Sequence, residues 1–216
     1  MNYLDLYDYR RRVLALYRDR NEALQDGKQP ETVLQRFREE RDRLFAHHPQ
    51  SALNEEQKRQ FQGLSYFPHN LQACVEATVE LRAESERGLA QTSGDETMPL
   101  RRSAILHFTI NGEAAELSMY WIDVYGGGLF LPFRDATAPV ETYGGGRYLF
   151  DTIKGSDFLV LSSDNGCQRI QLDFNYAYNP SCAYNHRWTC PLAPPENRLH
   201  MPIPAGEKNF SYPGPK

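Results

Sequence analysis

The chain has 216 residues, of which 40% are hydrophobic and 12% aromatic, so it can build a sizeable core and is not disordered over most of its length. The formal net charge of −4 argues against nucleic acid or an anionic membrane as a partner. The first residues are acidic where a signal peptide is basic, and no apolar run approaches the roughly 20 residues of a membrane span. We therefore expect a cytoplasmic protein.

The first part of the chain has the pattern of helices. Residues 3–20 place aromatic and aliphatic side chains along one helical stripe, and residues 31–46 repeat this pattern. Asn54 and Gln57 have the spacing of an N-terminal cap on a third, short helix. Acidic and basic residues are interleaved in this part, which indicates a solvated surface rather than a binding patch. We predict a helical arm over residues 1–65 that packs on the main core.

From about residue 72 the pattern changes to short strands and tight turns. Asn111-Gly112 is typical of a type I′ turn, and it predicts a hairpin over residues 103–122. Residues 84–99 look like a polar loop. The other predicted strands cover residues 72–82, 130–133, 147–153, 157–162 and 168–175.

About seven or eight strands without βαβ spacing predict a mostly β fold over residues 66–216. We expect an antiparallel barrel, closed or partly open, with a sandwich as the alternative. Residues 176–216 are rich in proline, asparagine and tyrosine, which excludes a regular helix there. Their many apolar side chains predict an ordered wrap on the barrel.

Two predicted strands carry polar residues that could form a site. Alternation along the strand that ends at Asn175 places Asp173 and Asn175 opposite its apolar residues. The same rule places Arg147 and Asp151 together on another strand. Arg147 could bind an anion while a nearby aspartate orients it or moves a proton. The alternative is a structural Arg–Asp ion pair.

The glycine run before Arg147 is open to two interpretations. Gly144, Gly145 and Gly146 could let backbone amides approach a phosphate group. The run lacks the lysine and hydroxyl of a P-loop, and no helix pattern follows it. A tight turn is therefore favoured.

Cysteines near the end of the chain suggest a third kind of site. Cys182, His186 and Cys190 lie at four-residue intervals, and His200 or Cys167 could complete a zinc site. Prolines around the two cysteines prevent the helix that would align them, so we expect no bound metal. A disulfide or reversible redox pair and simple packing cysteines remain open.

Several segments of the C-terminal half are distinctive as a set. They are residues 133–137, residues 141–149 with Glu-Thr-Tyr-Gly-Gly-Gly-Arg-Tyr-Leu, residues 172–184, and shorter motifs at 190–191, 194–197 and 205–208. Together with residues 63–68 they resemble the prokaryotic domain of unknown function 1684 family. The resemblance implies that residues 63–68 join the helical arm to the barrel, and it implies no known reaction. Because the distinctive segments concentrate polar residues, they favour a shared polar site.

The favoured hypothesis is a barrel that binds a small anionic molecule, and it leaves open whether the protein is an enzyme. The expected ligand-binding residues are Arg147, Asn175, Tyr143, Asp135 and Tyr178, and the expected catalytic residues are Asp173, Asp151 and Glu141. In particular, strand alternation predicts that Arg147, Asp173 and Asn175 line one polar cavity.

Two other classes of function stay open. One is a structural or protein-interaction module, and the other is a thiol or metal protein centred on Cys182 and Cys190. We expect no cofactor, no nucleic acid and no membrane partner. The sequence leaves a homo-oligomer open.

Overall fold

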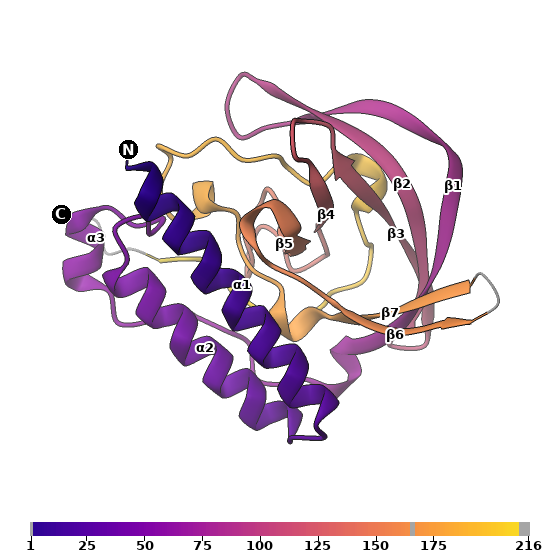
Figure 1. Ribbon diagram of the computed structural model, residues 1–216, viewed down its shortest axis with the longest axis horizontal. Coiled ribbons are helices and arrows are strands. Elements are labelled where there is room, and N and C mark those ends of the chain that lie inside the picture. Colours follow the sequence, from indigo (N-terminus) through magenta and orange to yellow (C-terminus); the bar gives the residue numbers. More distant parts are fainter. Residues whose placement is uncertain (1, 165–166, 212–216) are drawn as a thin grey trace.

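The computed structural model describes residues 2–164 and 167–211, without the side chains of residues 83–86, 163, 164 and 167. A helical arm, one antiparallel sheet and a long C-terminal segment follow each other along the chain (Figure 1). This order agrees with the predicted mostly β fold behind an N-terminal helical region.

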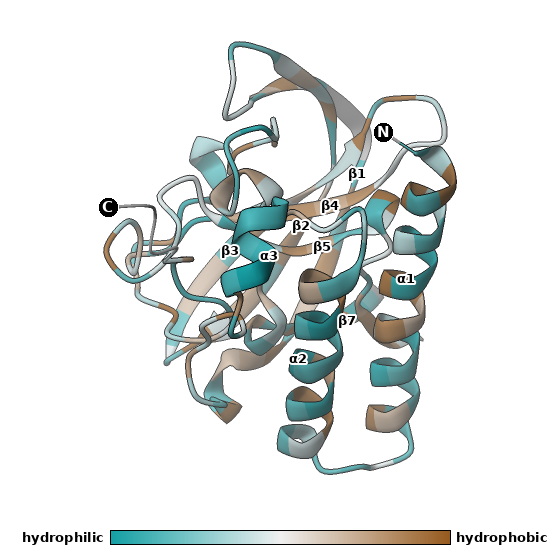
Figure 2. Ribbon diagram, turned by 90° about the vertical axis from the view of Figure 1, so that its left-hand side faces the viewer, coloured by the Kyte–Doolittle hydropathy of each residue, from teal (hydrophilic) through white to brown (hydrophobic). Residues whose placement is uncertain are grey.

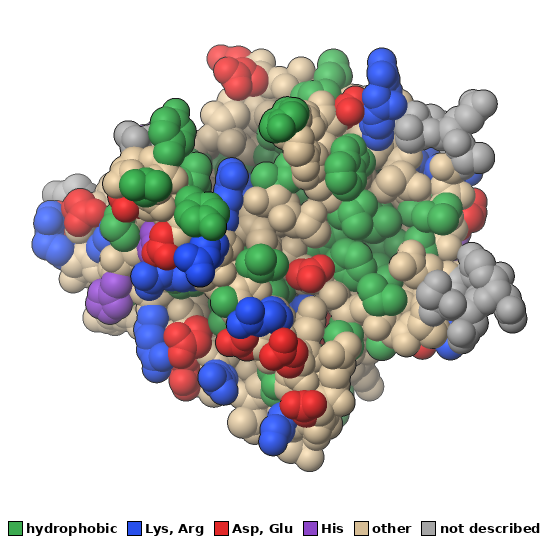
Figure 3. Space-filling view, viewed as in Figure 1, with side chains coloured by type: hydrophobic (Ala, Val, Ile, Leu, Met, Phe, Trp, Pro, Cys, Tyr) green, Lys and Arg blue, Asp and Glu red, His purple; other side chains and the backbone are tan. Residues whose placement is uncertain are grey.

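The arm contains α1 (Tyr3–Gln25), α2 (Pro30–His47) and α3 (Glu55–Gln60). The predicted cap is confirmed, because the side chains of Asn54 and Gln57 each bind the other's backbone N–H at the start of α3. Figure 2 shows α1 and α2 side by side along one side of the sheet, and charges of both signs are mixed over them in Figure 3. Among the described residues, no helix is long and apolar enough to cross a membrane.

Seven strands form one sheet in the order β5-β4-β3-β2-β1-β7-β6, and each neighbouring pair is antiparallel. The sheet curls into a half-barrel, and no ladder joins its edge strands β5 and β6 within the described residues (Figure 1). A partly open barrel is therefore confirmed. The strands are β1 (Cys74–Gln91), β2 (Thr97–Ile110), β3 (Glu113–Ile122), β4 (Gly128–Phe133), β5 (Arg147–Asp151), β6 (Leu159–Asp164) and β7 (Cys167–Asp173).

The turn between β2 and β3 is the predicted one. Asn111 has a φ of 53° and Gly112 a φ of 80°, as a type I′ turn requires. The prediction of a polar loop over residues 84–99 is wrong, because β1 and β2 stay paired as far as Gln91 and Thr97. Most described side chains at these strand ends are exposed. The backbones pair there without the alternation of apolar and polar residues from which we predicted strands.

Strand β7 ends two residues earlier than predicted. The Asp173 side chain accepts a hydrogen bond from the backbone N–H of Asn175 at 3.0 Å and begins η3, a single 3₁₀ turn (Phe174–Tyr176). Aspartate often diverts the backbone in this way. The strand alternation that we used for Asn175 therefore does not reach that residue.

The main core lies inside the curl. It unites side chains from the strands with Ile203 and Ala205 of the C-terminal segment, which are 1% and 0% exposed. A second cluster attaches the arm: Phe37 of α2 lies edge-on to Tyr17 of α1 and to Tyr176 of η3, with ring centroids 5.0 and 4.8 Å apart. Packing of this kind stabilises the arm against the half-barrel.

The C-terminal segment, residues 176–211, runs across the opening of the curled sheet (Figure 1). Its Glu207 is 1% exposed and accepts hydrogen bonds from Arg41 of α2 at 2.8 Å, from the Asn179 backbone at 2.7 Å and from the Tyr184 hydroxyl. Asn197 is 0% exposed and binds backbone groups of β3 and β4. Buried polar contacts therefore hold this segment at both the arm and the sheet.

Candidate functional site

Arg147 lies at the start of β5 and is 1% exposed. Its Nη2 donates to Asp135 Oδ1 at 3.0 Å and to the Ile203 carbonyl at 3.1 Å. Its Nη1 donates to the carbonyl of Glu207 at 3.3 Å and to that of Ala205. The guanidinium group thus has the contacts of a structural ion pair that also binds the C-terminal segment.

Asp173 and Asn175 lie together but have other partners. The Asn175 amide donates to Asp173 Oδ1 and to the Asn70 carbonyl, both at 2.8 Å, and its Oδ1 accepts from the Asn70 N–H at 2.9 Å. Burial raises the pKa of Asp173. The hydrogen bonds from Asn175 lower it, but the effect of burial is larger. Among the described residues, no hydrogen bond or ion pair joins Arg147 to this cluster.

The remaining predicted acids and Tyr178 are also spread out. Asp151 ends β5, is 3% exposed and lies 3.6 Å from the Lys154 ammonium group. The Tyr178 hydroxyl is 2.7 Å from Ser156 Oγ, on the loop that follows β5. Glu141 is exposed on the surface. Ser156 Oγ also hydrogen-bonds the backbone of Asp151, so Asp151 and Tyr178 border one buried polar region. Glu141 lies outside it.

Tyr143 stands on the glycine turn. The Gly146 N–H donates to the Tyr143 carbonyl at 2.9 Å, and Gly146 has a φ of 91°. A Cβ atom on Gly145 would lie 2.6 Å from the Tyr143 ring, and one on Gly146 would lie 2.5 Å from the Phe133 carbonyl oxygen. The tight-turn interpretation is confirmed, because the glycines allow close packing around Tyr143.

The Tyr143 side chain points to a thiol. Its hydroxyl oxygen is 3.5 Å from Cys182 Sγ, on η4 (Ser181–Ala183). The Cys182 N–H donates to Cys190 Sγ at 3.4 Å. Cys190 is 2% exposed, whereas Cys182 is half-buried. The structure thus brings a predicted ligand-binding residue and the predicted cysteine pair into one site.

The end of β1 holds the buried member of this pair. The Ser93 N–H donates to the Cys190 carbonyl at 2.8 Å, and the Cys190 N–H donates to Ser93 Oγ at 3.1 Å. Next to them, Thr92 and Pro191 form an isolated bridge. Cys190 is therefore held by the two residues that follow β1, whereas Cys182 is only half-buried.

The two thiols differ in acidity. A hydrogen bond from the Cys190 thiol lowers the pKa of Cys182 to about 6, against the effect of burial and with the help of Ser93 and Tyr143. The same hydrogen bond, together with burial, raises the pKa of Cys190. In Cys74, by contrast, burial raises the pKa to about 12. The hydrogen bond between the two thiols therefore favours the thiolate form of Cys182 and the protonated form of Cys190.

Other kinds of site have less support. Within the described side chains, no three His, Cys, Asp or Glu residues are placed to hold a metal ion, and His186 is exposed. The side chain of Cys167, the suggested further zinc ligand, lies outside the described residues.

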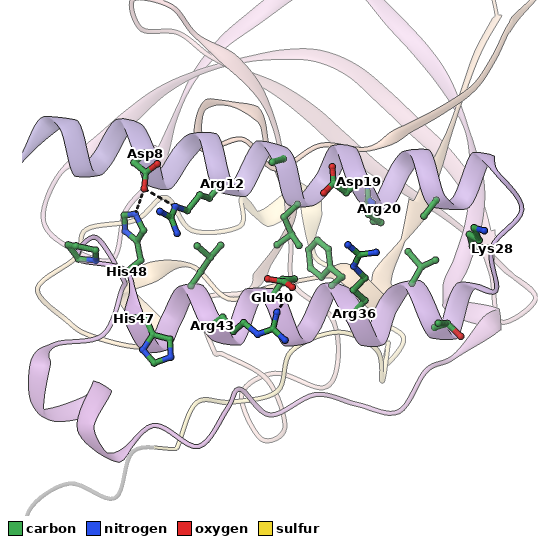
Figure 4. A pocket seen from close by; sticks show the side chains of 18 of the residues that line it. Asp8, Arg12, Asp19, Arg20, Lys28, Arg36, Glu40, Arg43, His47 and His48 are labelled. Carbon is green, nitrogen blue, oxygen red and sulfur yellow. Dashed lines mark hydrogen bonds and ion pairs between the residues drawn. The ribbon is translucent and has the colours of Figure 1, made fainter.

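A groove of about 970 Å³ runs between α1 and α2, with Leu16 and Phe37 in its lining (Figure 4). Charges of both signs alternate along it in Figure 4. Two of its cations are paired internally: Arg12 lies 2.7 Å from Asp8, and Arg43 contacts Glu40. Such mixed, paired charge does not select one sign of ligand.

From the sequence we did not identify two residues that lie near Cys182 and Cys190. Ser93 lies 97 residues before Cys190, in a stretch that we expected to be a loop. Lys154 belongs to η2 (Thr152–Lys154), directly after β5. No local motif links either residue to the cysteines, because the residues after β1 and the strand β5 meet the C-terminal segment only in the folded protein.

Comparisons with known proteins agree with this fold. A family model described as "Protein of unknown function (DUF1684)" matches residues 59–208, which include Ser93, Tyr143 and both cysteines. The solution NMR structure of the uncharacterized protein from gene locus rrnAC0354 of Haloarcula marismortui is similar, with 36% identity and a TM-score of 0.59. The similarity covers 87% of this chain and 97% of that chain. No curated protein matches.

The contacts of Arg147 predict a structural effect when it is replaced. Arg147→Met leaves Asp135 without its cation, and losing one partner of a buried ion pair costs about 3–5 kcal/mol. We expect a free energy of unfolding lower by about this amount in urea denaturation. Arg43→Met, which removes the exposed pair with Glu40, should cost less than about 1 kcal/mol. A loss that is no larger for Arg147→Met than for this control would favour a ligand-binding role instead.

The lowered pKa of Cys182 predicts its reactivity. With a pKa of about 6 the thiol is about nine-tenths ionised at pH 7, so alkylation by iodoacetamide should have its midpoint near pH 6. Peptide mass spectrometry follows Cys182 and, as an internal control, Cys74, which should react little below pH 9. Tyr143→Phe should move the Cys182 midpoint upward. A wild-type midpoint at about 8.5, as in a free thiol, would contradict this account.

Proposed function

Since the chain belongs to the DUF1684 family, whose description names no activity, we propose its function from its own site: thiol–disulfide exchange, with Cys182 as the reacting thiol and Cys190 as the resolving thiol. The substrate class is a low-molecular-weight disulfide.

The observation that carries this proposal is the contact between the two cysteines. The Cys182 N–H is 3.4 Å from Cys190 Sγ, and one thiol is partly exposed while the other is buried. An exchange protein needs one thiol that a substrate can reach and a second one close behind it. The Tyr143 hydroxyl adds a hydrogen-bonding group on the first thiol.

The first step uses the thiolate. Cys182 Sγ attacks one sulfur atom of the substrate R–S–S–R, so that a bond between Cys182 and R–S forms and the substrate disulfide breaks. The leaving group R–S⁻ takes a proton from water. Hydrogen bonds from Cys190 and Tyr143 stabilise the attacking thiolate before this step, which raises its population at neutral pH.

The second step uses the buried thiol. Cys190 gives its proton to solvent, and its sulfur attacks Cys182 Sγ in the mixed disulfide. The internal disulfide forms, and the second R–S⁻ leaves and is protonated. Two electrons have then passed from the cysteines to the substrate. A low-molecular-weight thiol reverses both steps and restores the reduced pair.

Anion binding at Arg147 receives less support than thiol exchange. The side chain is 1% exposed, and protein carbonyls and Asp135 occupy its Nη1 and Nη2. A ligand would have to displace these contacts, at the expense of a buried ion pair.

Trapping the mixed disulfide tests the proposal. Cys190→Ser treated with oxidised glutathione should accumulate a glutathione adduct at Cys182, because the second step is blocked. The wild type should instead form the Cys182–Cys190 disulfide without a lasting adduct. Intact-mass and peptide mass spectrometry distinguish these products.

Two variants serve as controls for the trapping experiment. Cys182→Ser should carry no adduct at Cys190, because that thiol is buried and un-ionised, and Cys74→Ser should behave as the wild type. An adduct at Cys74 with none at Cys182 in the Cys190→Ser protein would refute the proposed function.

A further inference from the structure

Asp151 is a buried carboxylate with an incomplete set of contacts. It is 3% exposed, and its Oδ1 is buried and has no hydrogen-bond partner among the residues that the structure describes. Its Oδ2 lies 3.6 Å from the Lys154 Nζ, which is three residues along the chain. A buried carboxylate held mainly by one cation is costly to keep, so the pair calls for an explanation beyond packing.

Tyr148 connects this pair to the thiol site. Its hydroxyl donates to the carbonyl of Pro191, the residue after Cys190, and the Lys154 Nζ is 6.0 Å from the centre of its ring. Lys154 and the Cys190 segment therefore both contact Tyr148. Between these groups the electrostatic influence is mutual: Lys154 lowers the pKa of Cys190, and Cys190 raises that of Lys154.

Lys154 carries its charge near neutral pH. Burial lowers its pKa, but the negative charge of Asp151 opposes this effect, and the pKa of Lys154 is raised overall. The side chain of Lys154 is 43% exposed, so water also reaches the ammonium group. The charged or titratable groups that act on Cys190 include Cys182 and Lys154. The hydroxyls of Tyr143 and Tyr148 also interact with it, and Cys190 raises the pKa of both.

We infer that Lys154, held in place by Asp151, is a positioning residue that promotes ionisation of Cys190 in the second exchange step. The inference rests on the proposed function and adds a residue to it. Lys154 does not touch the substrate, and it acts through the buried thiol.

The order of the two steps explains why a cation is needed there. In the reduced protein, Cys190 donates its hydrogen bond to the Cys182 thiolate and so keeps its proton. Once Cys182 is in a mixed disulfide, that negative charge is gone. Burial then remains as the obstacle to ionising Cys190, and the charge of Lys154 opposes it. Lys154 should therefore affect the second step and leave the first step unchanged.

Rapid-mixing kinetics with oxidised glutathione separate the steps, because each step releases one glutathione. For Lys154→Met we expect an unchanged first release and a second release that is roughly three- to tenfold slower at pH 7. The pH midpoint of the second release should rise. Lys154→Arg should restore both values. Lys28→Met, which removes an exposed cation in the turn between α1 and α2, is the matched control and should behave as the wild type.

Each outcome decides a different claim. If Lys154→Met leaves the second release unchanged, or slows both releases equally, the role of Lys154 is refuted. If the wild type forms no internal disulfide, the proposed function itself fails. Urea denaturation checks that Lys154→Met is folded, and Lys154→Gln, which can still hydrogen-bond Asp151, repeats the test if it is not.

Discussion

The buried carboxylate of Glu207 is the contact on which the arrangement of this protein depends. It binds Arg41 of the helical arm and, through Tyr184 and the Asn179 backbone, the C-terminal segment that crosses the half-barrel. A charge that is 1% exposed is stable only when such partners surround it. Both cysteines belong to this segment. Asn179 and Tyr184 flank Cys182, so the contacts of Glu207 help to hold Cys182 next to Cys190.

Most of the fold could be predicted because its signals are local. The Asn111-Gly112 turn and the cap at Asn54 depend on neighbouring residues alone, and both are present. Errors arose where local pattern and backbone pairing differ. The ends of β1 and β2 pair without apolar alternation, and the Asp173 side chain ends β7 before Asn175.

The candidate site could be predicted only in pieces. Sequence motifs singled out Tyr143, Asp151 and the two cysteines, but the hypothesis joined Arg147 with Asp173 and Asn175. The guanidinium of Arg147 is instead enclosed by Asp135 and by carbonyls of the C-terminal segment. A segment without regular periodicity has a path that local patterns do not reveal, and that path decides which polar residues meet.

The most direct test of this account is an equilibrium redox titration of the wild-type protein against mixtures of reduced and oxidised dithiothreitol. Quenching with acid and an alkylating agent, followed by peptide mass spectrometry, measures the fraction of Cys182 and Cys190 in a shared disulfide. We expect a single reversible two-electron transition for this pair, absent in Cys182→Ser and kept in Cys74→Ser. Free thiols at Cys182 and Cys190 across the whole range of potentials would contradict it.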